Sequence, residues 1–321
     1  MRRILVTGAY GFIGSNFINF WLKNHQDDSI INLDKMTYAA NENNVDKSLI
    51  KNNYRFIKGD ICDSDLVLSI AKEVDTVINF AAESHVDNSI SDPYMFIKSN
   101  YEGVFNLLEA TRKYDLRLHQ VSTDEVYGTL PLNSKEKFNE SSCYNPRNPY
   151  SATKAAADFL VRAYFNTYKI KATISNCCNN FGPNQHPEKL IPKTVFSALS
   201  NIDMPIYGDG MQVRDWIYVE DHVMALEKIL EIGKTGETYL ISSKKEVRNI
   251  DLVKDILKIL GKGEELIKFV KDRPGHDVRY SLDPSKLMKE LGWKPMYDFN
   301  ERLKFTISYY RRLYSTWLAS L

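Results

Sequence analysis

The chain has 321 residues, a mass of 37.0 kDa and a nearly balanced charge, with 42 Lys and Arg against 41 Asp and Glu. Its length allows a substantial core in one large domain or two smaller ones, and its balanced charge argues against a nucleic-acid partner, which would need clustered basic residues. The apolar run after Arg2 and Arg3 ends at Thr7-Gly8, too short for a signal peptide or membrane span, so we expect a cytoplasmic protein with no membrane partner.

The first half of the chain alternates short apolar runs with helical patterns. The runs predict buried parallel strands, and strands that alternate with helices predict an α/β fold with a doubly wound parallel sheet. The predicted strands are Arg3–Thr7, Ile30–Asp34, Tyr54–Asp60, Thr76–Ala81, Leu118–Ser122 and Lys171–Ser175. The predicted helices include Ser64–Lys72, Asn100–Tyr114 and Ser151–Tyr168.

The second half of the chain has a different texture. A turn-rich segment covers residues 180–187, and Pro and Gly recur as far as Gly210. Short amphipathic helices are predicted at Leu252–Leu260 and Ser285–Leu291, and a basic helix over residues 302–312. We therefore predict a Rossmann domain at residues 1–178 and a smaller domain at 179–321, from which some segments return to the Rossmann sheet.

A glycine motif, Gly8-x-x-Gly11-x-x-Gly14, lies between the first predicted strand and the following helix. Glycines let the backbone approach a pyrophosphate, and the helix N-terminus supplies unpaired N–H groups. Asp34, twenty residues beyond Gly14, can accept both ribose hydroxyls and would repel a 2′-phosphate. The motif therefore favours NAD over NADP, with Lys35 as a small opposing charge.

The Tyr150-x-x-x-Lys154 pair, at the start of a predicted helix, suits oxidation of an alcohol by a nicotinamide cofactor. Tyrosine can abstract the hydroxyl proton if its pKa is lowered, and a lysine one turn away stabilises the phenolate. Thr123, at the end of the fifth predicted strand, would hydrogen-bond the hydroxyl that is oxidised.

Two adjacent acids, Asp124 and Glu125, follow the fifth predicted strand. Ligands bind at the carboxyl ends of such strands, and neighbouring carboxyls can meet two unlike protonation demands. If a sugar is oxidised at carbon 4, Glu125 can remove the acidified hydrogen of carbon 5 while Asp124 protonates the departing carbon 6 hydroxyl. Hydride returned to carbon 6 then gives a 4-keto-6-deoxy sugar, so the acids predict a dehydratase that recycles its own cofactor.

The cysteines predict no metal site, because Cys62, Cys143, Cys177 and Cys178 form no C-x-x-C pair and no metal spacing with the histidines. Cys177 and Cys178 are adjacent within an apolar run, which predicts buried thiols.

Longer blocks of sequence surround the candidate residues: Asn32–Tyr38, Ala81–Asp87, Ser122–Gly128, Asn179–Pro183, Pro187–Pro192, Tyr207–Gly210, Val213–Trp216 and Arg273–Asp277. With these blocks the chain resembles the dTDP-glucose 4,6-dehydratases of the extended short-chain dehydrogenase/reductase superfamily over nearly its whole length. The resemblance implies a hydro-lyase that makes activated 6-deoxysugars, such as dTDP-rhamnose for polysaccharide. It also implies a homodimer joined by the helices over residues 100–114 and 151–168.

The resemblance assigns two sets of ligand contacts. NAD would meet the residues Gly8, Gly11, Phe12, Ile13, Gly14, Asp34, Lys35, Thr37, Asp60, Ile61, Ala81, Ala82, Ser84, Ser99, Tyr150, Lys154 and Asn180. The nucleotide sugar, dTDP-glucose, would be held by Ser84, Thr123, Asn179, Lys189, Leu190, Tyr207, Arg214, Asn249, Arg273 and His276. The two arginines are suited to a bidentate grip on a diphosphate.

The chain departs from the family pattern at Ala9-Tyr10, where small residues are usual, at Asn88 in place of an arginine, and at Phe181 in place of a tyrosine. A nucleotide-sugar 4-epimerase would share the glycine motif and the Tyr–Lys pair, but it needs no acid pair after Thr123. A dehydratase that acts on a CDP- or UDP-sugar is a further alternative, because the side chains of the pocket for the nucleotide base are unremarkable. A non-catalytic NAD-binding regulator is the alternative outside enzymes.

Overall fold

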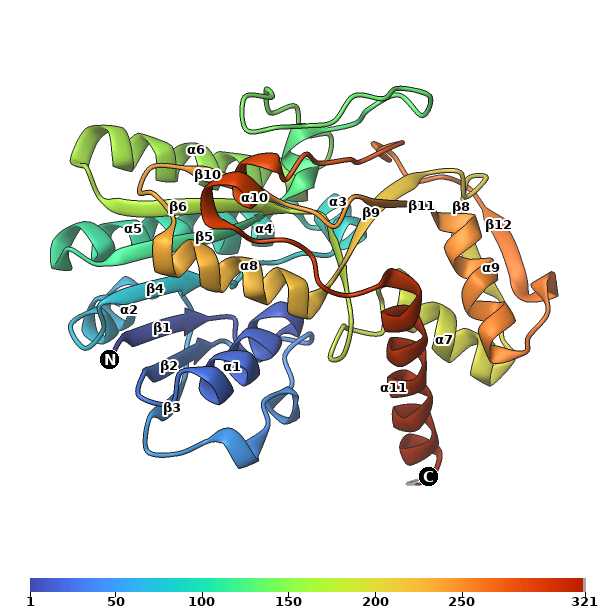
Figure 1. Ribbon diagram of the computed structural model, residues 1–321, viewed down its shortest axis with the longest axis horizontal. Helices are drawn as coiled ribbons and strands as arrows, with labels where there is room; N and C mark the ends of the chain where they lie inside the picture. The colour runs from blue at the N-terminus through green and yellow to red at the C-terminus, as the bar shows by residue number, and fades with distance from the viewer. Residues whose placement is uncertain (320–321) are drawn as a thin grey trace.

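Seven parallel strands form the central sheet in a computed structural model that describes residues 1–319 (Figure 1). These strands are β1 (Arg3–Thr7), β2 (Ser29–Asp34), β3 (Tyr54–Lys58), β4 (Thr76–Asn79), β5 (Arg117–Thr123), β6 (Lys171–Cys177) and β10 (Thr238–Ile241). Their order is β10-β6-β5-β4-β1-β2-β3. Strands β2 and β3 are therefore added on one side of β1 and the later strands on the other side, and the order reverses between β1 and β4. A crevice is expected at the carboxyl ends of the strands at such a point.

Helices cover both faces of this sheet. One face carries α1 (Phe12–Asn24), α8 (Val219–Ile232) and α10 (Ser285–Leu291), and the other carries α2 (Ser64–Ala71), α5 (Gly103–Tyr114) and α6 (Pro149–Tyr168). Side chains alternate along each strand, so Ile4 and Val6 pack on the α1 side while Leu5 packs on the α5 side. Burial on both faces explains why β1 and β4, in the middle of the sheet, are largely apolar, whereas the edge strand β3 is partly exposed and contains Arg55 and Lys58.

A second group of elements lies beyond the carboxyl ends of the central strands (Figure 1). It contains a three-stranded sheet, a two-stranded sheet and three helices around a core that includes Phe181, Leu252 and Ile307. Its elements are β7 (Asn179–Phe181), α7 (Leu190–Ser200), β8 (Met204–Tyr207), β9 (Val213–Tyr218), β11 (Lys245–Arg248), α9 (Asn249–Leu260), β12 (Ile267–Val270) and α11 (Phe299–Ala319). The predicted fold class is confirmed.

The boundary between the two groups is crossed by the chain more than once. After β9, α8 packs against α1 and β10 pairs with β6 at the edge of the central sheet. The basic helix expected over residues 302–312 is part of α11, and only one of its faces is solvated, because Leu303, Ile307 and Tyr310 are buried. None of the helices within residues 1–319 is long and apolar enough to cross a membrane.

Several predicted boundaries moved. Helix α6 begins at Pro149, so Tyr150 is already helical, and α5 begins at Gly103 after a π-helical turn over Lys98–Glu102. Two short helices, α3 (Val86–Ser91) and α4 (Pro93–Ile97), precede that turn. Strands β3 and β4 end earlier than predicted, which places the following residues at the edge of the crevice.

Candidate active site

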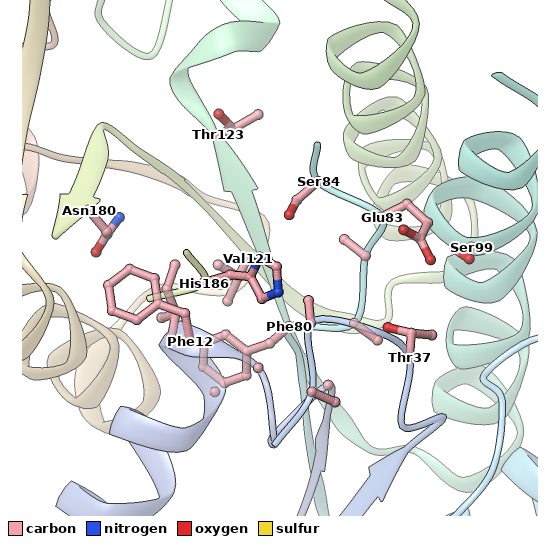
Figure 2. A pocket seen from close by; sticks show the side chains of 18 of the residues that line it. Phe12, Thr37, Phe80, Glu83, Ser84, Ser99, Val121, Thr123, Asn180 and His186 are labelled. Carbon is pink, nitrogen blue, oxygen red and sulfur yellow. The ribbon is translucent and has the colours of Figure 1, made fainter. Parts of the chain in front are cut away.

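A cavity of about 330 Å³ lies at the carboxyl ends of the central strands. Every residue predicted to contact the cofactor lines it, including Asn180 from the second half of the chain. Figure 2 shows Thr37 and Ser99 on one side of this space and Asn180 on the other. The assignment of these residues to NAD stays a prediction, but the fold brings all of them to one place.

The glycine motif forms a tight backbone cradle at the entrance to α1. Gly8 has a φ of 66°, and a Cβ built there would lie 2.6 Å from the Ala81 backbone nitrogen. A Cβ on Gly14 would lie 2.5 Å from the carbonyl oxygen of Gly8. Gly11 is the N-cap of α1 and offers no side-chain cap, so the first N–H groups of the helix are left for a ligand. These features fit a pyrophosphate.

The end of β2 fits an adenosine ribose. Asp34 is 6% exposed, and its carboxylate accepts hydrogen bonds from the backbone nitrogens of Tyr10 (2.9 Å) and Met36 (2.8 Å). Burial raises the pKa of Asp34, while these two bonds lower it. Lys35 forms an ion pair with Asp60, with 2.7 Å between Nζ and Oδ2. Because that ammonium is paired with a carboxylate, it does little to offset the repulsion of a 2′-phosphate by Asp34.

The acid pair lies on a single 3₁₀ turn, η4 (Asp124–Tyr127), which follows β5 directly. The Thr123 hydroxyl caps this turn by accepting a hydrogen bond from the Glu125 nitrogen at 3.3 Å. Asp124 is 2% exposed, and one of its carboxyl oxygens has no hydrogen-bond partner within the described structure. Glu125 lines the cavity, whereas Asp124 lies behind the lining.

The two acids have different electrostatic surroundings. Burial and the neighbouring Glu125 raise the pKa of Asp124 well above its usual range. Burial also raises the pKa of Glu125, but the positive charges of Arg273, Arg214 and Lys189 oppose that rise. The surroundings therefore favour the protonated form more strongly at Asp124 than at Glu125, which suits Asp124 as the proton donor and Glu125 as the proton acceptor.

Tyr150 and Lys154 occupy the first turns of α6, whose start is fixed by a capping box between Asn148 and Ser151. Burial and the nearby Glu125 raise the pKa of Tyr150, and the neighbouring Thr123 side chain opposes that rise. The lysine Nζ donates to the Val121 carbonyl at 2.8 Å. The expected role of Tyr150 as a base requires a lowered pKa, whereas burial raises it in the structure.

Four of the residues predicted to hold the nucleotide sugar also line the cavity: Ser84, Thr123, Asn179 and Lys189. Lys189 Nζ donates to the Ser84 carbonyl at 3.1 Å, which joins the loop before α7 to the segment after β4. The buried Oδ1 of Asn179 has no hydrogen-bond partner within the described residues. An unsatisfied acceptor at a cavity wall suits a donor from a ligand.

The remaining predicted sugar contacts do not line the cavity; they are Leu190, Tyr207, Arg214, Asn249, Arg273 and His276. Asp87 joins two of them, because its carboxylate accepts from the Tyr207 hydroxyl (3.0 Å) and lies 3.4 Å from Arg273 Nη1. His276 Nδ1 lies 2.7 Å from an Asp272 carboxyl oxygen. Asp87 was not among the predicted site residues, although it ends one of the family-like blocks.

Arg214 is buried and held in place by the protein itself. Its guanidinium donates to the carbonyls of Val213 (2.9 Å) and Asp277 (2.9 Å) and lies 4.4 Å from the centre of the Tyr280 ring. The positive charges of Arg214 and Arg273 both act on Glu125, so these residues are electrostatically part of the same site.

Asn180 differs most from its predicted role. Its amide donates to the Cys178 carbonyl (3.0 Å) and its Oδ1 lies 2.9 Å from His222 Nδ1, so the side chain is largely used within the protein. Cys177, Cys178 and His222 also line the cavity, and none was predicted to do so. Cys177 ends the buried strand β6 and Cys178 follows it, which is a usable signal, whereas nothing in the sequence points to His222.

The departures from the family pattern are accommodated in the structure. The ring of Tyr10 packs 4.8 Å from that of Phe56. Phe181 is fully buried against Trp216 and Tyr218, where no hydroxyl is needed. Asn88 makes a long contact, 3.5 Å, with the Tyr38 hydroxyl.

Known proteins are similar in sequence to this chain over nearly its whole length. Residues 5–306 match the family model described as GDP-mannose 4,6 dehydratase. The dTDP-glucose 4,6-dehydratase of Mycobacterium tuberculosis (strain ATCC 25618 / H37Rv) is 46% identical over 316 residues, covering 98% of this chain and 95% of the relative. The chain belongs to the dTDP-glucose 4,6-dehydratase family. The family enzyme of Salmonella typhimurium is 43% identical over 334 residues, covering 96% of this chain and 92% of the relative.

Solved structures of the family have the same fold. The dTDP-glucose 4,6-dehydratase of Bacillus anthracis, in complex with NAD, matches with a TM-score of 0.90 and 42% identity over 97% of each chain. The UDP-glucose 4-epimerase of Thermus thermophilus, also in complex with NAD, matches with a TM-score of 0.88 but only 29% identity, over 96% of this chain and 99% of the epimerase. The resemblance predicted from the sequence blocks is confirmed.

Proposed function

We propose that the protein is an NAD-dependent dTDP-glucose 4,6-dehydratase. The observation that carries the proposal is the buried acid pair on one turn. Its Glu125 lines the same cavity as Tyr150, Lys154 and the glycine motif, and Asp124 lies directly behind that lining. The family membership supports this activity. An epimerase would need the glycine motif and the tyrosine but not two neighbouring acids in different electrostatic surroundings.

NAD, held by the glycine motif and Asp34, would supply the hydride acceptor for carbon 4 and the hydride donor for carbon 6. Thr123 would orient the carbon 4 hydroxyl, because it lines the same cavity as Tyr150 and its side chain acts on the pKa of that phenol. Tyr150 would take the proton of that hydroxyl. A buried phenolate is costly, so the charge of Lys154 would be needed to make this proton transfer favourable.

The elimination would use the acids in opposite roles. Asp124, kept neutral by burial, would protonate the carbon 6 hydroxyl as it leaves. Glu125, with Arg273, Arg214 and Lys189 opposing its protonation, would remove the hydrogen of carbon 5. Ketone formation at carbon 4 acidifies that hydrogen, so oxidation has to precede the loss of water.

The proposal includes a homodimer. Large apolar side chains are exposed along α4, the π-helical turn, α5 and α6, among them Tyr94 (63%), Ile97 (49%), Phe105 (42%) and Phe159 (55%). Exposed apolar side chains on several neighbouring helices suit a protein–protein interface. The remaining parts of the proposal are a cytoplasmic location, a role in dTDP-rhamnose or related 6-deoxysugar synthesis, NAD binding by residues 1–178, and sugar binding mainly by residues 179–321.

The test is turnover of dTDP-glucose by the purified full-length protein. We expect a 4-keto-6-deoxy product without net accumulation of NADH, and protein stripped of cofactor should regain activity with catalytic amounts of NAD. UDP-glucose and CDP-glucose, assayed in parallel, distinguish the nucleotide. A carbon 4 epimer as the product, or NADH formed in proportion to product, would contradict the proposal.

A further inference from the structure

A hydrogen-bond network outside the cavity joins the two segments expected to hold the cofactor. At its centre is Asn184, which lies in the turn after β7 and is not among the residues that line the cavity. Its Nδ2 atom donates to Ser15 Oγ at 3.2 Å and to the Asn44 carbonyl at 3.1 Å. Its Oδ1 atom accepts from the Tyr309 hydroxyl at 2.7 Å. One side-chain amide therefore ties together α1, α11 and the β2–β3 segment (residues 35–53).

The contact with Ser15 reaches the pyrophosphate cradle. Ser15 lies in the first turn of α1, and its hydroxyl donates to the Phe12 carbonyl at 3.0 Å. Asn16, the next residue of the helix, donates from its amide to the Pro183 carbonyl at 3.0 Å. Phe12 itself lines the cavity (Figure 2). The turn that contains Asn184 therefore supports the end of α1 at which N–H groups are left for a ligand.

The contact with Asn44 reaches the ribose carboxylate. The Asn44 amide donates to the Tyr10 carbonyl at 3.0 Å, and the Tyr10 nitrogen donates to Asp34 Oδ2 at 2.9 Å. The β2–β3 segment also supplies Thr37 to the cavity wall (Figure 2). A continuous chain of hydrogen bonds thus runs from Asn184 to the group expected to bind the adenosine ribose.

The backbone and the side chain of residue 184 both suit asparagine. Its φ of 70° lies in the left-handed region, which asparagine and glycine adopt at lower cost than most residues. Glycine would satisfy the backbone but would make none of the three side-chain bonds. A side chain has to donate twice and accept once to join all three partners, which an amide does and a carboxylate does not.

Helix α11 holds the same turn firmly. Next to Tyr309, the buried Tyr310 places its hydroxyl 2.9 Å from the carbonyl oxygens of both Gly182 and Gln185, on either side of the asparagine. Tyr310 belongs to the core of the second group of elements. The turn is therefore a fixed support, from which Asn184 can restrain α1 and the β2–β3 segment.

We propose that Asn184 is a positioning residue for NAD: it holds the start of α1 and the β2–β3 segment in their binding geometry before the cofactor arrives. The inference rests on the proposed function, in which NAD is the cofactor, and extends it by one residue. Without the bonds of Asn184, the two segments have more freedom in the cofactor-free protein, and NAD has to order them as it binds. The loss therefore appears in affinity, whereas the loaded enzyme keeps its geometry and its rate.

The experiment measures the Kd for NAD of Asn184→Gly by direct titration of the full-length protein stripped of cofactor. Glycine keeps the left-handed backbone, so the variant removes the side-chain bonds alone. Loss of the two bonds to the cofactor segments should raise the Kd about 5- to 30-fold. The kcat at saturating NAD should be unchanged. ADP-ribose, which has the ribose and the diphosphate but no nicotinamide, should lose affinity by the same factor.

Asn53→Gly is the matched control. Asn53 is also partly buried, and its amide donates to the carbonyls of Gln26 (3.2 Å) and Asp28 (2.9 Å), away from the cavity lining. Both variants lose two donated bonds and gain a glycine, so both should lose stability to denaturant. Only Asn184→Gly should also lose part of the stabilisation that a fixed concentration of NAD provides, because that stabilisation depends on the Kd.

An unchanged Kd in Asn184→Gly would overturn the proposal, as would an equal rise in Asn53→Gly or a fall in kcat at saturating NAD. If Asn184→Gly does not fold, Tyr309→Phe removes the bond that orients the amide and should raise the Kd by a smaller factor. An unchanged Kd in that variant then counts against the proposal. The proposed function fails instead if the wild-type protein binds NAD and does not convert dTDP-glucose, so the two failures are distinguishable.

Discussion

Replacing Asp34 by asparagine tests the cofactor assignment at its most sensitive point. The carboxylate is 6% exposed and holds two backbone N–H groups, so its charge is both shielded from water and fixed in direction. The amide keeps the shape but loses the charge that would accept the ribose hydroxyls. A charge-assisted hydrogen bond contributes about 1.5–3 kcal/mol, so the Kd for NAD should rise about 10- to 150-fold.

Direct titration with NAD and NADP measures both parts of this prediction. Asp34→Asn should weaken the binding of NAD. It should also bring the Kd values for NAD and NADP closer together, because the carboxylate no longer repels a 2′-phosphate. Asp28→Asn is a suitable control, since Asp28 is also buried and accepts from a backbone nitrogen, that of Arg2, but lies outside the cavity. It should cost stability and leave the Kd unchanged. A wild-type protein that binds NADP as tightly as NAD would refute the ribose assignment.

Three further predictions follow from the site and the helix surface. Asp124→Asn and Glu125→Gln should slow water loss about 10²–10⁴-fold and leave a slowly decaying transient of reduced nicotinamide in single-turnover absorbance, whereas Tyr150→Phe should show almost no transient. Dehydration at the wild-type rate by Glu125→Gln would show that this residue is not the carbon 5 base. Lys154→Met should stabilise the protein without bound NAD by about 3 kcal/mol at pH 7. The reason is that the lysine pKa is about 8 in the folded protein and 10.5 in the unfolded chain, so the charged lysine favours the unfolded chain. That gain should be complete below pH 8 and vanish as the pH rises to 10.5, and denaturant unfolding that shows a pH-independent difference would contradict it. Phe159→Glu, at an exposed position on α6, should convert the expected dimer to a folded monomer in light scattering, and an unchanged mass would count against that interface.

The sequence was most informative where local chemistry decides the structure. The apolar runs located the first strands because residues such as Ile4 and Val6 are buried on one face of the sheet and Leu5 on the other. The glycine motif and Asp34 could be picked out as candidate cofactor contacts, because a close backbone approach requires glycine and a carboxylate is needed to accept hydrogen bonds from ribose hydroxyls. Strand β10 was not predicted as a strand, since its four residues join the sheet only through pairing with β6, which lies far away in the sequence.

The site was harder to predict where its properties depend on tertiary contacts. The different electrostatic surroundings of Asp124 and Glu125 come from burial and from the arginines that the second half of the chain brings near Glu125. The contact between Asn180 Oδ1 and His222 Nδ1 could not be predicted from the local sequence, because the two residues lie on separate elements. Asn184 is similar, since its hydrogen-bond partners come from three separate elements that only the fold brings together.

The position of β10 also has a consequence for synthesis of the chain on the ribosome. Strand β6 is complete at Cys177, but its neighbour in the sheet ends at Ile241. At about 5–20 residues per second, the intervening stretch takes roughly 3–13 s to emerge. During that interval the nascent chain presents the unpaired edge of a strand that is buried in the finished fold, and an unpaired strand edge can template aggregation. The central sheet therefore cannot be completed until Thr238–Ile241 has been translated, so folding of the first half of the chain depends on residues in the second half.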